Sequence, residues 1–84
     1  MIEIRFFAAL RERVGSDSLT VTAPQGTDTV TALVAWLEED NAAVARALEA
    51  TPHYMVAVNE VLSQEQTAIR DGDVVALFPP VTGG

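Results

Sequence analysis

The sequence predicts an α+β roll, in which a mixed sheet of about five strands packs on one main helix. Hydrophobic residues alternate with the period of a strand near both ends of the chain, over residues 2–7, 18–22 and 74–78. Between them lies the clearest helical pattern, a stripe of apolar residues spaced i, i+3, i+4 and i+7. The residues of this stripe are Val30, Leu33, Val34 and Leu37.

The first strand is predicted over residues 2–7, because alternate side chains there are large and apolar. Residues 8–14 predict a short helix, and Gly15 stands where a helix commonly ends in a left-handed conformation. Residues 18–22 alternate again and predict the second strand. The side of the first strand expected to be buried carries Ile2, Ile4 and Phe6, and the other side carries Glu3, Arg5 and Phe7.

The main helix follows a turn at residues 24–26. Either Asp28 or Thr29 is a suitable N-cap, because the side-chain oxygen of each can accept a hydrogen bond from the first helical turn. A second, weaker helix is predicted over residues 42–50, and Pro52 closes it. The sequence therefore places both longer helices between the second and third strands.

Strand character returns over residues 54–58, and Asn59-Glu60 forms a tight turn into a short strand at residues 61–62. Residues 71–73, Asp-Gly-Asp, form a turn into the last strand, residues 74–78. Both faces of this last strand are apolar, so one face is left outside if the other packs on the main helix. An uncovered patch of this kind would mark a protein interface. The alternative is that loops or the short helix of residues 8–14 cover this face. The inward residues are Val75 and Leu77, and the outward ones are Val74, Ala76 and Phe78, with Phe7 beside them.

The last strand stops at Pro79-Pro80, and the printed sequence ends on Gly83-Gly84. Proline cannot donate to a sheet ladder and favours an extended exit, while glycine makes the thinnest peptide. These observations predict a domain over residues 1–78 and an extended, flexible tail over residues 79–84 that presents its carboxylate. The simpler interpretation is a frayed chain end, where glycine is common.

The composition fits one globular domain of 84 residues, of which 49% are hydrophobic. No apolar run approaches the length of a membrane span, and no secretion signal is visible, so we expect a cytoplasmic protein. The net charge is −7, and all five basic residues are arginines. Because such a chain is repelled by phosphate groups, the charge argues against nucleic acids and anionic membranes as partners.

The sequence offers little for catalysis by this chain alone. It has no cysteine, which excludes disulfides, thiolate metal sites and cysteine nucleophiles. Its single histidine, His53, follows a proline in a turn-like stretch and is interpreted as a loop residue. No nucleophile–base set, phosphate-binding loop or metal-ligand spacing is present. We therefore expect no bound metal or cofactor.

With these features in view, the chain resembles the small subunit of molybdopterin synthase over its whole length. The resemblance is most specific in the last seven residues and weak in residues 38–55. The matching segments near the start are Met1-Ile2, Phe6-Phe7-Ala8, Arg11-Glu12 and Val14-Gly15. Those near the end are Asp71-Gly72-Asp73, Val75-Ala76 and the run Phe78-Pro79-Pro80-Val81-Thr82-Gly83-Gly84.

The resemblance implies a β-grasp (ubiquitin-like) fold and the role of a sulfur carrier. In that family an adenylyltransferase similar to ubiquitin-activating enzymes uses ATP to adenylate the C-terminal glycine, and a sulfur donor protein then converts it to a thiocarboxylate. The large synthase subunit receives the tail, and two such transfers of sulfur to cyclic pyranopterin monophosphate build the molybdopterin dithiolene. This chain would be the non-catalytic subunit of the complex.

Carried over by position, the resemblance makes Gly84 the residue that bears the sulfur. The segment expected to enter the partner's active site is Pro80, Val81, Thr82, Gly83 and Gly84. The partner-contacting surface is matched by Phe78, Phe7 and Arg11, to which the outward residues Val74 and Ala76 add.

Other functions remain open from the sequence. A sulfur carrier for thiamine-thiazole synthesis shares the fold and the Gly-Gly end, although the longer chain and the Phe-Pro-Pro-Val-Thr spacer argue against it. A ubiquitin-like modifier would join Gly84 to a lysine of another protein after the same activation step. A plain interaction module would have a tail without chemistry. A stand-alone enzyme fits least well, because the nucleophile and base are missing.

Overall fold

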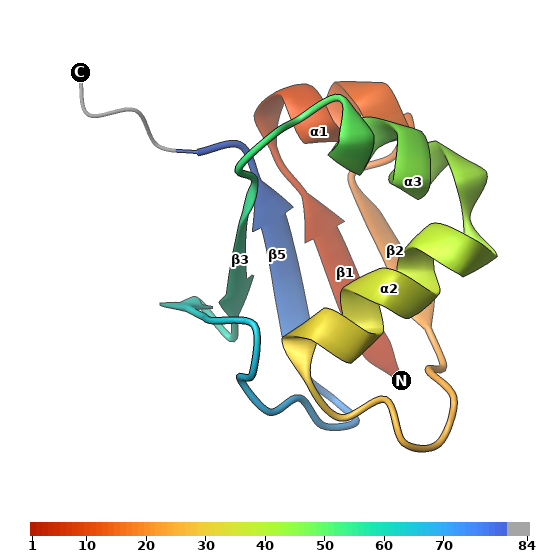
Figure 1. Cartoon of the computed structure of the whole chain (residues 1–84), viewed down its shortest axis with the longest axis vertical. Coiled ribbons are helices and arrows are strands. Elements are labelled where there is room, and N and C mark those ends of the chain that lie inside the picture. The colour runs from red at the N-terminus through yellow and green to blue at the C-terminus, as the bar shows by residue number, and fades with distance from the viewer. Residues whose placement is uncertain (81–84) are drawn as a thin grey trace.

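The computed structural model describes residues 1–80 and forms the predicted roll around a five-stranded mixed sheet (Figure 1). The order of strands across the sheet is β2-β1-β5-β3-β4. In chain order the elements are β1 (Ile2–Phe6), α1 (Ala8–Val14), β2 (Ser18–Val21), α2 (Val30–Asp40), α3 (Ala42–Glu49), β3 (Met55–Val58), β4 (Val61–Leu62) and β5 (Val74–Phe78). The predicted elements are all present, with ends that differ by a residue or two.

The helix ends follow from local hydrogen bonding. Gly15 ends α1 with a φ of +85°, a conformation that costs glycine little. Thr29 is the N-cap of α2, and its Oγ1 accepts a hydrogen bond of 3.2 Å from the N–H of Ala32. Asn41 separates α2 from α3: its own N–H donates to a carbonyl of α2, and its side chain accepts from the first N–H groups of α3.

The two central strands of the sheet are the first and the last in sequence. β1 and β5 run parallel, with Ile4 opposite Val75 and Phe6 opposite Leu77. β2 flanks β1 and β3 flanks β5, both antiparallel. The carboxyl ends of β1 and β5 therefore lie at the same edge of the sheet, where Figure 1 also shows α1 and α3.

The core lies between one face of the sheet and the three helices, and α2 crosses that face (Figure 1). The predicted stripe on α2 is buried, as are the inward residues of β1 and β5. The sequence-based expectation of one main helix understates α1 and α3, which also enter the core. Leu10 comes from α1, and Val44, Ala47 and Leu48 come from α3.

A polar contact joins α1 to the end of α3. The guanidinium of Arg13 donates to the carbonyl of Ala50 at 2.9 Å and also to Oγ1 of Thr51. Thr51 is 5% exposed, and its hydroxyl donates to the carbonyl of Ala47 at 2.9 Å. Because its hydrogen-bonding groups are used, this buried threonine is accommodated at the junction of the two helices.

The last strand ends at Phe78, as the two prolines after it predict, and Pro79 and Pro80 belong to no helix or strand. The predicted tail residues Val81, Thr82, Gly83 and Gly84 lie outside the described residues. Within residues 1–80, no helix is long and apolar enough to cross a membrane.

Candidate functional site

The candidate site is the face of the sheet that points away from the helices, called here the open face. Alternate residues of a strand point to opposite sides, so the register of the sheet defines this face. Arg5 of β1, Ala76 of β5 and Ala57 of β3 lie side by side across it. Glu3 lies opposite Val74, and Phe78 lies opposite Met55. These four residues point to the same side and also belong to the open face.

The apolar end of the open face lies where the chain leaves the sheet. Phe78 ends β5, and Phe7 follows β1 at the neighbouring position, where its N–H donates to the carbonyl of Leu77 at 3.1 Å. Met55 stands on the other side of Phe78. Phe7 is 45% exposed, a large fraction for a phenylalanine. Large exposed aromatic side chains of this kind commonly anchor protein interfaces.

The backbone after β1 contributes to the position of Phe7. Ala8 has a φ of +52°, which is uncommon for a residue with a side chain. This left-handed residue turns the chain out of β1 directly into α1. Phe7 consequently keeps the extended backbone of a strand residue, although it directly precedes a helix. Its side chain points to the open face, as that of Arg5 does.

Two hollows on this side of the molecule share Phe7. One, of about 540 Å³, is lined by Phe7 and Arg5 together with Val74, Ala76, Asn59 and Glu60. The other, of about 270 Å³, is lined by Phe7, Arg5, Arg11 and the polar residues Glu3, Asp17 and Ser18 among others. Arg5 is hydrogen-bonded to Glu3, and this contact raises the pKa of the Arg5 guanidinium. Arg5 and Arg11 thus border the apolar part of the open face.

The structure brings four of the five predicted interface residues onto one face, and the fifth borders it. Phe78, Phe7, Val74 and Ala76 lie on the open face, and Arg11 shares a hollow with Phe7. Their role as contacts to a partner stays a prediction. The sequence did not single out Met55 or Arg5, because placing Met55 beside Phe78 requires the pairing of β3 with β5. The apolar character of both faces of residues 54–58 was the available signal.

The remaining predicted site residue of the described chain is Pro80, which lies one residue beyond Pro79 at the same edge of the sheet and is exposed. Gly84, the predicted sulfur-bearing residue, and Val81, Thr82 and Gly83 lie outside the described residues. Within residues 1–80, no group of three His, Asp or Glu side chains is placed to hold a metal ion. What the described part offers is an exposed apolar face next to Pro79 and Pro80, where the chain leaves the sheet.

The sequence matches a known protein family over nearly its whole length. Residues 4–84 match the model of the ThiS family. The molybdopterin synthase sulfur carrier subunit of Escherichia coli (strain K12) is 43% identical over 84 residues, and the alignment covers 100% of both chains.

Two solved structures show the same fold. The crystal structure of Haloferax volcanii small archaeal modifier protein 1 superposes with a TM-score of 0.77 at 29% identity, covering 95% of this chain and 97% of that one. A chain of the complex of subunits 1 and 2 of the molybdopterin-converting factor from Helicobacter pylori 26695 superposes with a TM-score of 0.67 at 30% identity, covering 99% and 97%. These likenesses confirm the β-grasp (ubiquitin-like) fold.

Proposed function

The chain belongs to the ThiS family, and on that basis we propose that it is the sulfur carrier subunit of a molybdopterin synthase. The observation that carries the proposal is the match of 43% identity to a sulfur carrier subunit of molybdopterin synthase, which runs over the whole of both chains. The structure adds an apolar open face beside the exit of the Pro79-Pro80 segment, which suits a carrier that docks while its tail enters an active site.

The chemistry is proposed to take place at Gly84. An α-carboxylate has a pKa of about 3.3–3.7, so at neutral pH it is ionised and a poor acyl donor. A partner adenylyltransferase activates it: a carboxylate oxygen attacks the α-phosphate of ATP, and pyrophosphate leaves. Hydrosulfide released by a donor protein then attacks the acyl carbon and displaces AMP, which leaves a thiocarboxylate. Because this sulfur sits on the main chain, a protein without cysteine can carry it.

Transfer is proposed to occur on a large subunit, which would bind the open face and take the segment from Pro80 to Gly84 into its active site. There the sulfur passes to cyclic pyranopterin monophosphate. The Helicobacter pylori complex of subunits 1 and 2, one chain of which shares this fold, supports a partner of this kind. The catalytic groups then belong to the large subunit, while this chain supplies the sulfur and a docking surface.

Protein modification is a second candidate, favoured by the likeness to a small archaeal modifier protein at a TM-score of 0.77. In that role the activated Gly84 would form an amide bond with a lysine side chain of another protein. Intact-mass analysis of proteins recovered with this chain separates the two roles, because only a modifier leaves covalent conjugates.

Reconstitution tests the proposed function directly. The chain, prepared with a thiocarboxylate at Gly84, is mixed with a purified large subunit and cyclic pyranopterin monophosphate. We expect molybdopterin to form and the thiocarboxylate to return to a carboxylate. Failure to convert the precursor, under conditions in which the Escherichia coli carrier subunit supports conversion, would contradict the proposal.

The open face yields a prediction about docking. Phe78→Ala should weaken binding to the large subunit at least about tenfold, because truncating a central aromatic side chain of an interface commonly costs more than about 1–2 kcal/mol. Met55→Ala should act in the same direction, since Met55 lies opposite Phe78. Isothermal titration calorimetry with the large subunit measures both effects.

Val61→Ala is the matched control for docking. Val61 is 68% exposed and apolar, but its partner in the sheet is Val58, which belongs to the core rather than to the open face. Its truncation should leave binding unchanged. The three variants should also keep the circular dichroism of the parent chain. If Phe78→Ala unfolds the chain and spares binding, the faces of β5 have been assigned the wrong way round.

A further inference from the structure

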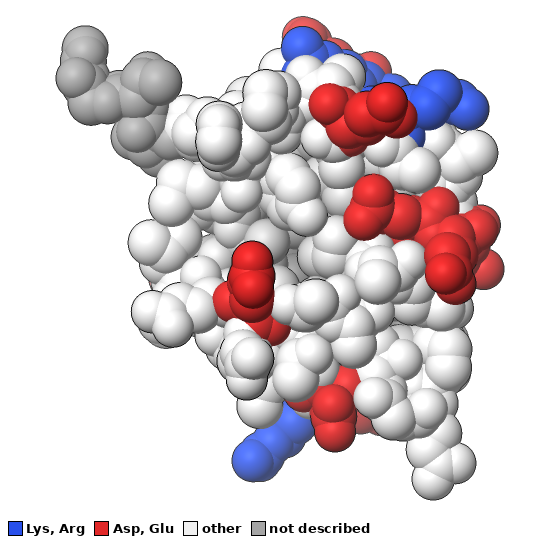
Figure 2. All heavy atoms as spheres, in the orientation of Figure 1, with Lys and Arg blue, Asp and Glu red and all other residues white. Residues whose placement is uncertain are grey.

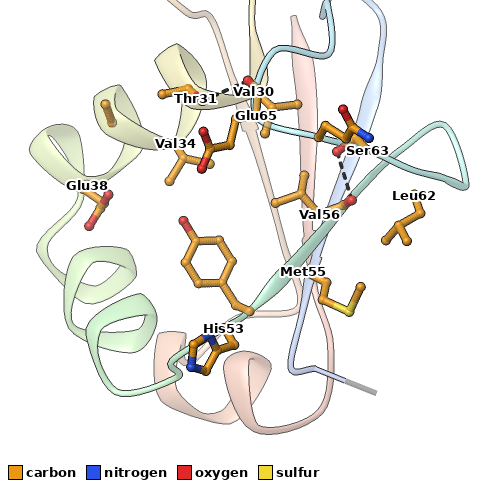
Figure 3. A pocket seen from close by; sticks show the side chains of 13 residues that line it. Val30, Thr31, Val34, Glu38, His53, Met55, Val56, Leu62, Ser63 and Glu65 are labelled. Carbon is orange, nitrogen blue, oxygen red and sulfur yellow. Dashed lines mark hydrogen bonds between the residues drawn. The ribbon is translucent and has the colours of Figure 1, made fainter. Parts of the chain in front are cut away.

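We propose that the groove between α2 and β3 binds an extended, cationic segment of a partner protein. This groove, called here the α2–β3 groove, lies at the free edge of the sheet, on its helix-covered side. It has a volume of about 540 Å³. Its apolar lining includes Val30 and Val34 from α2 and Val56 from β3, as Figure 3 shows.

One end of the α2–β3 groove is held open by backbone contacts. The first residues of α2 are bonded to the loop after β4: the N–H of Thr31 donates to the carbonyl of Glu65 at 3.0 Å, and its Oγ1 donates to the same oxygen at 2.8 Å. The N–H of Val30 donates to the carbonyl of Thr67 at 3.0 Å. Because α2 and this loop are fixed to each other, the groove is a formed feature of the fold.

The charged groups of the groove indicate the sign of its occupant. The carboxylates of Glu38, on α2, and Glu65, on the loop after β4, both point into the space between α2 and β3 (Figure 3). No lysine or arginine lines the groove within the described residues, and the chain carries a net charge of −7. Figure 2 shows acidic side chains spread over this side of the molecule. The groove therefore favours a positively charged ligand.

The acidic environment of the groove also acts on Tyr54. Its side chain is half-buried and lines the α2–β3 groove. Burial raises the pKa of the Tyr54 hydroxyl, and the negative charges of Glu38 and Glu65 raise it further. Both carboxylates thus act on one point in the groove, where a lysine or arginine side chain would be attracted.

The backbone of β3 offers an edge to an extended ligand. β4 pairs only with Ala57 and Val58, so the part of β3 before Ala57 has no neighbouring strand on this side. The carbonyl of Val56 is taken by Ser63, whose N–H and hydroxyl both donate to it at 2.9 Å. Residues two apart in an antiparallel strand present their backbone groups to the same side, so those of Tyr54 point to the same edge as those of Val56. Within residues 1–80 the N–H and C=O of Tyr54 form no backbone hydrogen bond. An extended peptide can pair with such an edge.

The α2–β3 groove shares Met55 with the docking surface of the proposed function, but its floor lies on the other side of the sheet. The open face carries Phe78 and Ala76, whereas the floor of the groove is formed by Val56, which packs against the core on the other side of the sheet. A partner segment in the groove and a large subunit on the open face would therefore contact opposite sides of β3. The proposal can be tested without any assumption about sulfur transfer.

The test uses the full chain and a synthetic probe, acetyl-Arg-Val-Arg-Val-Arg-amide, followed by amide chemical shifts in nuclear magnetic resonance. We expect saturable shifts at Tyr54, Val56 and Glu65. The double variant E38Q/E65Q should weaken binding about fivefold, the size expected for two partly exposed ion pairs. The matched control is E12Q/E49Q, which makes the same change of charge on α1 and α3 and should bind as the parent does. Phe78→Ala should also bind as the parent does.

Four results would overturn the proposal: no saturable shifts, shifts confined to the open face, equal weakening in the two double variants, or equal binding of a probe in which glutamate replaces arginine. Equal weakening would show that the net charge alone attracts the peptide. None of these results bears on the sulfur carrier function, since the reconstitution described above does not involve the probe.

Discussion

Removing Gly84 is expected to abolish sulfur transfer by this chain and to leave its melting temperature unchanged. The proposed thiocarboxylate is built on the carbonyl carbon of Gly84, so a chain that ends at Gly83 presents its carboxylate one residue short of both active sites. The core lies within residues 2–77, which explains why stability should not change. Production of molybdopterin in the reconstituted system measures the loss, and thermal denaturation measures stability.

Two further variants sharpen this prediction. An alanine added after Gly84 should be as damaging as the deletion, because it displaces the carboxylate from the adenylating site. Gly83→Val should also fail, because a branched side chain blocks a channel suited to glycine. Val61→Ala is the control and should keep full activity, since Val61 is exposed and lies outside both the tail and the open face. Full activity from the chain without Gly84 would exclude the carrier role.

The largest expected effect on stability comes from Leu33→Ala. Leu33 lies in the predicted stripe on α2, and its side chain is 0% exposed. Truncating a fully buried leucine removes its contacts and leaves a cavity, so the free energy of unfolding should fall by roughly 2–5 kcal/mol. Urea denaturation followed by circular dichroism measures this loss.

The control for Leu33→Ala is the same substitution at an exposed leucine. Leu62 is 59% exposed, so Leu62→Ala should change the free energy of unfolding by no more than about 0.5 kcal/mol. A change of similar size in the two variants would mean that α2 does not pack on the sheet through this stripe.

The sequence predicted those parts of the fold that depend on residues close together in the chain. The helix of residues 8–14 and its end at Gly15 follow from local spacing and from the left-handed conformation that glycine tolerates. The burial of Leu33 follows from the helical period. The last strand ended at Phe78 as expected, because Pro79 cannot continue a ladder.

What the sequence did not predict depends on pairings between distant segments. Met55 joins Phe78 on the open face only because β3 runs antiparallel to β5, and no local pattern fixes that register. The contribution of α3 to the core was underestimated, since its short apolar pattern gives no sign that α1 packs against it. The α2–β3 groove likewise arises between segments some twenty residues apart, Val34 and Tyr54 among them.

The most direct test of the sulfur carrier function is the intact mass of the chain after incubation with the adenylyltransferase, ATP and a sulfur donor. We expect a mass gain equal to the replacement of one oxygen by sulfur, located at Gly84 by fragmentation. The gain should be absent without ATP and absent in the chain that lacks Gly84. An unmodified Gly84, under conditions that convert the Escherichia coli carrier subunit to its thiocarboxylate, would contradict the sulfur carrier function.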